Sequence, residues 1–234
     1  MIPWVQLGKA AVPGGGELRL MRRDSEFSIR LGAEELMNSR ISGSEEALAT
    51  LACARIRDRP RPRVLIGGLG MGFTLRSALS VLRADAQIDV AELIPAVAQW
   101  AENEMAEIFG DSLRDPRVHL ELIDVARLIG RRGAAYDAIL LDVDNGPEGF
   151  TRRANDQLYD RRGLAAARAA LRPGGVLAVW SSGPDRKFTQ RLRDAGFVTE
   201  EASARARGAR GGARHVIWIA VRPTDGHDRS GARR

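Results

Sequence analysis

Three carboxylates stand at the ends of successive apolar runs in this sequence. Glu92 closes "QIDVAE", Asp124 follows "RVHLEL", and Asp142 closes "YDAILLD". If these runs are parallel strands, their carboxyl ends lie at one edge of a sheet, where open α/β sheets bind ligands. A carboxylate there can accept hydrogen bonds from ribose hydroxyls, from an adenine amino group or from a reacting amine. The three acids therefore predict a ligand site at that edge.

A glycine-rich turn precedes these acids, between the first apolar run and the helix expected after it. The stretch "VLIGGLGMGFTLR" contains Gly67, Gly68, Gly70 and Gly72. Glycines let the backbone turn tightly and approach a ligand, although such a turn can also serve packing alone. Glu92 follows at about the twenty-residue spacing of an acid that binds ribose. A nucleoside is favoured over NAD, because the turn lacks a strict GxGxxG and no second mononucleotide half is visible.

Asp142, Asp144 and Asn145 are the candidates for the chemical step. A carboxylate beside an amine or hydroxyl that attacks a sulfonium carbon can take the proton that the nucleophile loses. Asp142 is placed for this role, and Asp144 and Asn145 would orient a polar or cationic acceptor. Because Asp, Asn, Gly and Pro are also turn residues, a simple turn is the alternative for "DVDNGPEG". Such side chains also suit Mg²⁺, but the next strand end adds no acid before Asp185, so no metal site is predicted.

The hydrophobic pattern predicts the elements that position these residues. From Arg63 onward, short apolar runs alternate with helical stretches, which is typical of strands covered by helices on both faces. This predicts a Rossmann-like, doubly wound α/β sheet, mostly parallel, with an antiparallel hairpin at its C-terminal end. The expected nucleoside-binding domain covers residues 61–222, followed by a tail, 223–234, expected to be disordered. The helical stretches lie near residues 72–83, 95–109, 124–131, 156–171 and 185–194.

A smaller unit is expected over residues 1–60. Residues 1–16 look loose, and the alternating stretch "ELRLMRRDSEFSIRLGAEELMNSR" predicts a small antiparallel β-meander. The stretch "GSEEALATLACARI" predicts a helix with Glu45 and Glu46 in its positively polarised first turn. Pro60 then ends the unit, because proline interrupts helices.

Composition limits the remaining function classes. The chain has 234 residues, 44% of them hydrophobic, which is enough for one sizeable α/β domain with a small appendage, and no apolar segment is long enough to cross a bilayer. A single cysteine and an N-terminus without a signal-peptide pattern favour the cytoplasm. The net charge of +6 comes almost entirely from dispersed arginines, and only 5% of residues are aromatic. Solvated arginine is therefore favoured over an RNA-binding surface.

The motifs resemble those of the spermidine synthase family, the polyamine aminopropyltransferases, which share the class I S-adenosylmethionine-dependent methyltransferase fold. "IGGLGMGFTLR" resembles the family's "GGGDGGTLRE", "AELIP" resembles "VEIDP", and "YDAILLDVDNGP" resembles "YDVIIvDssDPvGP". The resemblance covers roughly residues 17–221. It implies that Glu92 holds ribose, that Asp124 holds adenine, and that Asp142 accepts the proton of the attacking amine.

The sequence also departs from that family. Where the family carries an acid that contacts the amine of decarboxylated S-adenosylmethionine, this chain has Gly70, which favours a pocket that tolerates the full tail of S-adenosylmethionine. Ala47 and Leu48 stand where the family has two polar side chains that contact the polyamine. We therefore expect methyl transfer to a small-molecule acceptor such as an amine. Aminopropyl transfer to a non-standard amine and a non-catalytic nucleoside-binding scaffold are the alternatives, and the resemblance is compatible with a homodimer.

Overall fold

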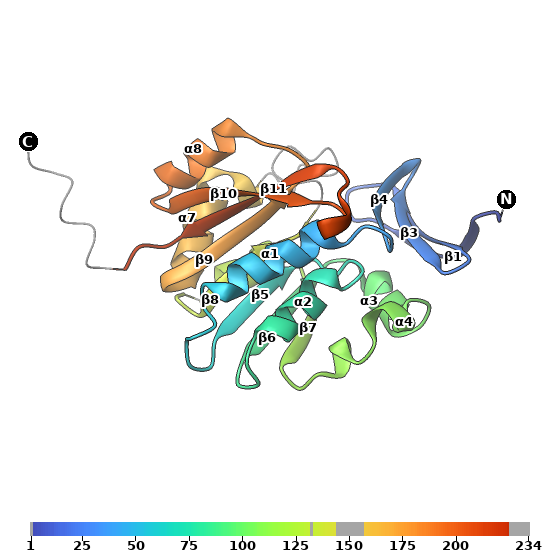
Figure 1. Ribbon diagram of the computed structural model, residues 1–234, viewed down its shortest axis with the longest axis horizontal. Coiled ribbons are helices and arrows are strands. Elements are labelled where there is room, and N and C mark those ends of the chain that lie inside the picture. Colours follow the sequence, from blue (N-terminus) through green and yellow to red (C-terminus); the bar gives the residue numbers. More distant parts are fainter. Residues whose placement is uncertain (1, 132, 144–156, 225–234) are drawn as a thin grey trace, which may run out of the picture.

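The protein contains two β-sheets, a small one formed by the N-terminal residues and a large one that carries most of the core (Figure 1). The computed structural model describes residues 2–131, 133–143 and 157–224. The small sheet is antiparallel and consists of β1 (Val5–Ala11), β2 (Glu17–Arg23), β3 (Glu26–Leu31) and β4 (Glu34–Asn38).

The large sheet has the strand order β10-β11-β9-β8-β5-β6-β7 among the described residues. The pairs β5–β6, β5–β8, β6–β7 and β8–β9 are parallel, whereas β11 is antiparallel to both β9 and β10. The predicted doubly wound sheet with a closing antiparallel hairpin and a preceding antiparallel β unit is confirmed. The strands are β5 (Arg63–Gly67), β6 (Gln87–Glu92), β7 (Val118–Leu122), β8 (Tyr136–Leu141), β9 (Leu171–Ser181), β10 (Val198–Arg205) and β11 (Arg214–Val221).

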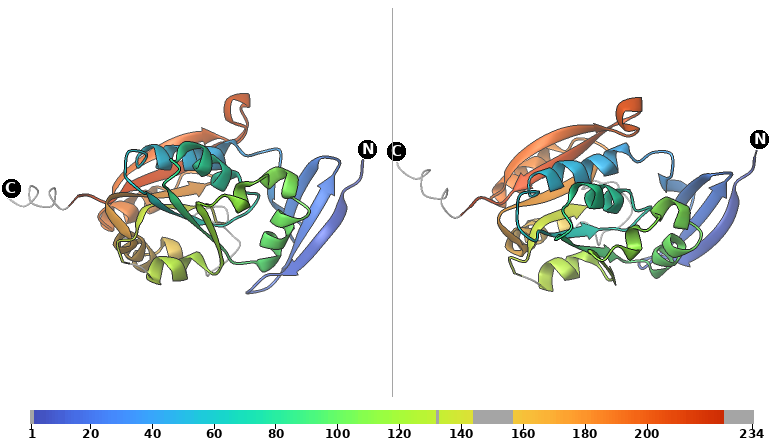
Figure 2. Two further views of the ribbon diagram at one scale, coloured as in Figure 1. Left: turned by 90° about the horizontal axis from the view of Figure 1, so that it is seen from below. Right: turned by 60° about the horizontal axis from the view of Figure 1, so that its bottom comes forward.

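Helices cover both faces of the large sheet (Figure 2). They are α1 (Gly43–Ala54), α2 (Phe73–Val81), α3 (Pro95–Glu102), α4 (Ala106–Phe109), α5 (Val125–Arg131), α7 (Arg161–Ala170) and α8 (Arg186–Asp194), with short 3₁₀ turns at Ser112–Arg114 and Gly208–Arg210. All of β8 is buried, and its side chains alternate between two cores. Ala138 and Leu140 join the core beneath α1 and α2, while Ile139 and Leu141 join the core beneath α5, α7 and α8.

The expectation that residues 1–16 are loose is wrong. Residues Val5–Ala11 form β1, which pairs with β2 through a register irregularity between Gln6 and Gly8. Most side chains of β1 are exposed or partly exposed, so this edge strand carries no apolar alternation by which the sequence could reveal it. Gly8 lies against Trp100 of α3, and a Cβ at Gly8 would overlap the indole ring. The small sheet is thus anchored to the large domain by a close backbone-to-ring contact.

Helix α1 follows the small sheet in sequence but packs against the large domain. It contacts α2, β8 and β9, and it places Leu48, Ala52 and Cys53 in the core. The division of the chain at residue 60 stays a prediction, and residues 225–234 of the expected tail lie outside the described residues. None of the described helices is both long and apolar enough to cross a membrane.

Asp137 ties three segments together at the amino-terminal end of β8. Its buried carboxylate accepts hydrogen bonds from Nη1 of Arg59 at 2.7 Å, from the backbone N–H of Arg63 at 2.8 Å and from Nη1 of Arg172 at 2.7 Å. These contacts join the segment after α1, the start of β5 and the start of β9. An acid held in this way leaves several donors without an acceptor when it is replaced.

Asp137→Asn is expected to lower the free energy of unfolding by about 2 kcal/mol. The loss stays below the full cost of breaking a buried ion pair, because the side chains of Arg59 and Arg172 are 28% and 42% exposed and can turn to water. Urea denaturation followed by circular dichroism measures it. Asp111→Asn is the matched control, since the side chain of Asp111 is 97% exposed. Equal stability of the two variants would contradict the structural role of Asp137.

Candidate active site

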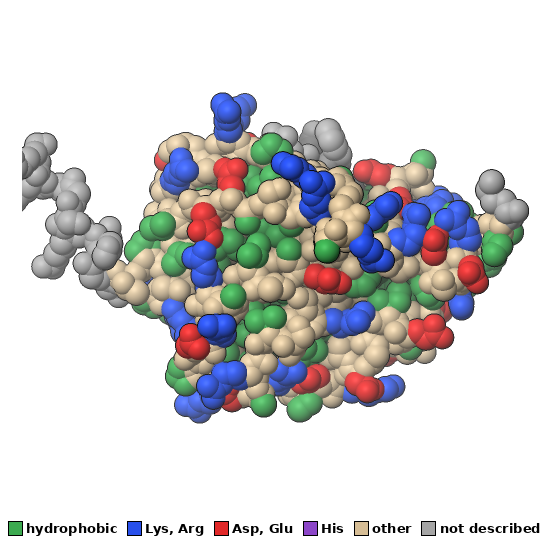
Figure 3. Space-filling model, in the orientation of Figure 1, with side chains coloured by type: hydrophobic (Ala, Val, Ile, Leu, Met, Phe, Trp, Pro, Cys, Tyr) green, Lys and Arg blue, Asp and Glu red, His purple; other side chains and the backbone are tan. Residues whose placement is uncertain are grey.

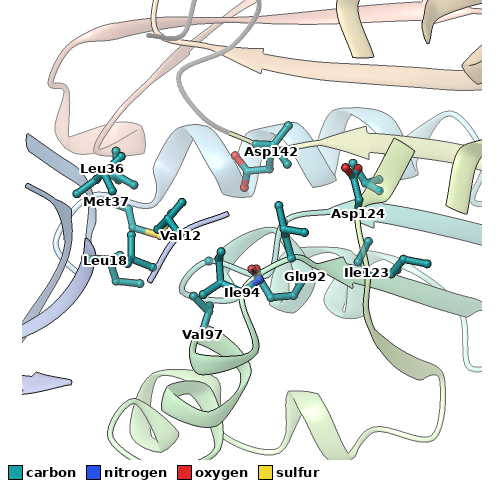
Figure 4. Close-up of a pocket in the computed structure, with 18 residues that line it drawn as sticks. Val12, Leu18, Leu36, Met37, Glu92, Ile94, Val97, Ile123, Asp124 and Asp142 are labelled. Atoms are coloured by element: carbon teal, nitrogen blue, oxygen red, sulfur yellow. Dashed lines mark hydrogen bonds between the residues drawn. The ribbon is translucent and has the colours of Figure 1, made fainter. Parts of the chain in front are cut away.

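A cavity opens between the carboxyl ends of the central strands and the small sheet (Figure 4). It spans about 880 Å³ of space between atoms, part of which is open to solvent. The structure brings five of the sequence-predicted residues together in its wall. They are Gly68, Gly70, Glu92, Asp124 and Asp142. The small sheet and its connections supply an apolar wall opposite the acids, formed by Val12, Leu18, Ile29, Leu31, Leu36 and Met37.

Glu92 ends β6 and fixes the glycine-rich turn in place. Its Oε2 accepts the backbone N–H of Leu69 at 3.0 Å, and its Oε1 accepts the backbone N–H of Ile94 at 2.7 Å. Burial raises the pKa of Glu92, and the backbone N–H donors around it oppose that rise. Each carboxylate oxygen has a second lone pair, so Glu92 can hold the turn and still accept hydrogen bonds from ribose hydroxyls.

Asp124 combines two roles that the sequence leaves as alternatives. One oxygen, Oδ1, accepts the backbone N–H of Ala126 at 2.8 Å at the start of α5. The side chain also lines the cavity, where Figure 4 shows it near the end of β7 on the same side as Asp142. One oxygen can therefore support the helix start while the other accepts a hydrogen bond from a ligand.

The predicted glycines are required at their positions for different structural reasons. Gly68 has φ +87°, and a Cβ there would lie 2.7 Å from the carbonyl oxygen of Asp142, so glycine lets the turn pass the end of β8. Gly67 does not line the cavity, because its Cα packs against Val125 and Leu141. Gly72 begins α2 with φ +76°, lines a second, adjoining cavity and leaves room for a neighbouring phenylalanine ring.

The second cavity places two carboxylates in one crevice. It encloses about 660 Å³ of empty space and is lined by Glu45, Gly70, Asp142 and Trp180, among others. Thr74 donates a hydrogen bond from Oγ1 to Oδ2 of Asp142 at 2.5 Å. Burial raises the pKa of Asp142 to about 6, against the opposing effect of this hydrogen bond. The pKa of Glu45 is raised to about 7, first by burial and second by the charge of Asp142.

The charged side chains that line the two cavities are all carboxylates. They are Glu45, Glu92, Asp124 and Asp142, and neither lysine nor arginine lines either cavity among the described residues. Adjacent carboxylates in a partly desolvated crevice raise each other's pKa and attract cations. The arrangement therefore favours ligands that carry positive charge and disfavours ligands that carry a carboxylate or phosphate.

Nucleic acid is a poor match for this site. Among the described residues, the charged side chains that a phosphate would meet in the crevice are carboxylates, and basic and acidic side chains are interspersed over the face of the protein in Figure 3. No group of three or more His, Cys, Asp or Glu side chains placed to hold a metal ion occurs in the described part of the chain.

Two of the predicted catalytic residues, Asp144 and Asn145, lie outside the described residues. Sequence reasoning missed Glu45 and Thr74, which the structure brings to Asp142. A usable signal existed for Glu45, because it lies three, four and seven residues before the buried positions 48, 49 and 52 of α1. Glu45 therefore lies on the inward-facing side of α1, whereas Glu46 is exposed. No signal of this kind marks Thr74.

The comparisons with known proteins point to one family. No protein-family model matches the chain. The chain is 32% identical to a polyamine aminopropyltransferase of Pseudomonas aeruginosa over 126 residues, which are 52% of this chain and 34% of that protein. It is 31% identical to a polyamine aminopropyltransferase of Mycobacterium tuberculosis over 140 residues, 58% of this chain and 25% of that protein. The matches thus span about a quarter to a third of the length of these two relatives.

The structural comparisons extend over almost the whole chain. The spermidine synthase of Thermotoga maritima superimposes with a TM-score of 0.73 at 17% identity and covers 94% of this chain and 74% of that one. A probable spermidine synthase of Corynebacterium glutamicum gives a TM-score of 0.64 at 15% identity, with 93% of this chain and 79% of that one covered. The spermidine-synthase-like character that the motifs indicated is confirmed.

The coupled carboxylates predict a pH dependence of stability. Glu45 and Asp142 have raised pKa values, so the folded state holds protons that the unfolded chain releases between about pH 4 and pH 7. The contribution of these two groups to stability is therefore expected to be fully present below this window and to be lost as the pH rises through it. Glu45→Gln removes one ionising group and is expected to stabilise the protein more at pH 8 than at pH 5.

Urea denaturation of both proteins at several pH values measures this difference. Glu46→Gln, on the exposed side of the same helix turn, is the matched control and should show a much smaller dependence. If the difference between Glu45→Gln and the parent protein does not change with pH, the pKa of Glu45 is not raised in the folded state.

Proposed function

We propose that the protein is a transferase that moves the aminopropyl group of decarboxylated S-adenosylmethionine to a small cationic amine, with Asp142 as the general base. The observation that carries the proposal is the uniformly acidic lining of two adjoining cavities among the described residues. The curated relatives are named polyamine aminopropyltransferases, which supports the same reaction. The proposed acceptor is an amine with a second positively charged end.

The charge of the site favours aminopropyl transfer over the methyl transfer expected from Gly70. S-adenosylmethionine carries a carboxylate in its tail, whereas its decarboxylated form carries only positive charge there. Gly70 would favour the full tail only if no other acid took the place of the missing one. Glu45 reaches the crevice from a different element, α1, and lines the same cavity as Gly70. The carboxylate of a full tail would therefore face Glu45 and Asp142, which disfavours its binding.

The proposed arrangement assigns the two cavities to the two substrates. Glu92 and Asp124 accept hydrogen bonds from the nucleoside in the larger cavity, opposite the apolar wall of the small sheet. Glu45, Asp142 and Trp180 hold the acceptor amine in the smaller one, into which the charged end of the donor tail also points. Asp142 and Gly70 line both cavities, so the reacting atoms meet beside Asp142.

Asp142 would remove the proton that the reaction makes acidic. The lone pair of the neutral acceptor nitrogen forms a bond to the aminopropyl carbon, and the carbon–sulfur bond breaks with its electron pair going to sulfur. The nitrogen becomes positively charged and transfers a proton to the carboxylate of Asp142. Thr74 fixes the orientation of that carboxylate through its short hydrogen bond. A pKa of about 6 leaves Asp142 largely ionised at neutral pH and able to act as the base.

Donor affinity distinguishes the two transfer reactions. Isothermal titration calorimetry at pH 7.5 is expected to give at least about tenfold tighter binding of decarboxylated S-adenosylmethionine than of S-adenosylmethionine, because only the latter carries a carboxylate. Glu45→Gln is expected to narrow this ratio. Methylthioadenosine, which has no charged tail, is the control ligand and should bind the parent and Glu45→Gln alike. Equal or tighter binding of S-adenosylmethionine would instead support methyl transfer.

Asp142→Asn is expected to lower kcat about 100-fold or more, the usual contribution of a positioned general base. Release of methylthioadenosine from decarboxylated S-adenosylmethionine, with a series of linear diamines as acceptors, measures the rate. The control, Asp111→Asn, removes an exposed carboxylate outside the cavity lining and should retain full activity. Undiminished turnover by Asp142→Asn would assign the base to another group.

A further inference from the structure

A buried serine connects the acidic crevice to a histidine on the closing hairpin. The hydroxyl of Ser44 lies 2.7 Å from Oε2 of Glu45 and 2.8 Å from Nδ1 of His215. Ser44 is fully buried, whereas His215, on β11, keeps part of its surface exposed. The imidazole packs edge-on against Trp180, with ring centroids 4.8 Å apart, which holds it in place. Three side chains from two separate elements thus form one hydrogen-bonded row between the crevice and the surface.

Helix capping does not explain the position of Ser44. The residue that precedes α1 as its N-cap is Ser42, whose side chain makes no capping hydrogen bond. The hydroxyl of Ser44 instead bonds sideways to Glu45 and His215. Because burying a hydroxyl is costly unless it is hydrogen-bonded, these two contacts account for the serine at this position.

The hydroxyl of Ser44 carries one hydrogen, so the row has two arrangements. When Glu45 is protonated, its O–H donates to Ser44 and the O–H of Ser44 donates to Nδ1 of His215, which requires the hydrogen of the imidazole to be on Nε2. When Glu45 is ionised, Nδ1–H of His215 donates to Ser44 and Ser44 donates to the carboxylate. Burial lowers the pKa of His215, which keeps the ring neutral in both arrangements near pH 7.

We propose that Ser44 and His215 form a proton relay that carries the proton of the acceptor amine from the Glu45–Asp142 pair to solvent. Glu45 transfers its proton to Ser44 Oγ while the hydroxyl proton of Ser44 moves to Nδ1 of His215. The imidazolium then releases its Nε2 proton to water, and Glu45 takes the proton held by Asp142, which lines the same crevice. Exchange with water returns the imidazole hydrogen from Nδ1 to Nε2, which resets the row for the next proton. No electrons are exchanged, and one proton leaves for each aminopropyl group transferred. This proposal rests on the proposed function, in which Asp142 receives that proton.

The charges around the row hold a proton at Glu45 and favour the last step of the relay, release from His215. Glu46 lies beside Glu45 on α1 and raises its pKa slightly, as Asp142 does from β8. On the hairpin, His215 stands opposite Ala204, and the next pair in register consists of Arg205 and Arg214, both exposed. The negative charge thus gathers at the crevice end of the row and the positive charge lies near its outer end, so a proton that reaches His215 is readily released to solvent.

The tautomer of His215 tests the relay without any need for turnover. In protein labelled with ¹⁵N-histidine, His215 is expected to carry its hydrogen on Nε2 at pH 6 and on Nδ1 at pH 8.5, because Glu45 ionises between these values. Glu45→Gln and Ser44→Ala are expected to abolish this change, and Ser44→Thr to keep it. The chain has three histidines, so His119→Gln and His227→Gln assign the signals. An unchanged tautomer across this range in the parent protein would overturn the relay.

The rate of reaction tests whether protons use the row during turnover. With decarboxylated S-adenosylmethionine and a diamine, Ser44→Ala is expected to lower kcat about tenfold with KM nearly unchanged, because proton removal and not binding is impaired. Added imidazole buffer is expected to restore part of the loss, and Ser44→Thr to retain most of the activity. Ser42→Ala is the matched control at the same helix start. Ser44→Ala activity equal to the parent at every pH and buffer concentration would overturn the relay in catalysis.

The two measurements separate failure of the relay from failure of the proposed function. If the parent protein turns over no amine but the tautomer of His215 switches with Glu45, the proposed function fails and the hydrogen-bonded row stands. If amines are turned over and the tautomer does not switch, the aminopropyl transfer stands and the relay is refuted.

Discussion

The candidate site depends on one constraint. Several carboxylates lie together in a crevice, and no basic side chain lies beside them among the described residues. Glu45 and Asp142 reach the crevice from different elements, α1 and β8, and both lose solvent there. Elsewhere the protein neutralises its buried acids. Asp137 has two arginine partners, and Asp89 is paired with Arg63. Among the described residues, the acids without a basic partner therefore lie at the end of the sheet that carries the candidate site.

Parallel strands predict the location of such a site well and its composition less well. The apolar runs that end at Glu92, Asp124 and Asp142 fix three acids at one edge, and the structure brings them to one cavity. Those residues could be predicted because strand order and side-chain position both follow from local pattern. Glu45 reaches the adjoining cavity, which Asp142 also lines, through the packing of α1 on α2, a tertiary contact that requires the helical face to be assigned first.

The errors in the sequence predictions have physical causes of the same kind. Strand β1 is an edge strand with largely exposed side chains, so no apolar alternation identifies it. Methyl transfer is expected from Gly70 alone, whereas an acid from α1 lines the same cavity as Gly70, a contact that no linear motif contains. Charge at a site is the sum over every element that reaches it, and only the fold determines that sum.

The larger cavity has one wall on each of two sheets that share no backbone pairing among the described residues. The acids stand on the large sheet, while the apolar wall belongs to the small one, which lies against α3 where Gly8 meets Trp100. Any ligand that fills the space between them contacts both sheets and therefore stabilises their packing against each other. Substitutions in the apolar wall of the small sheet can therefore enlarge the cavity for a longer or bulkier ligand. They leave the acids on the large sheet unchanged.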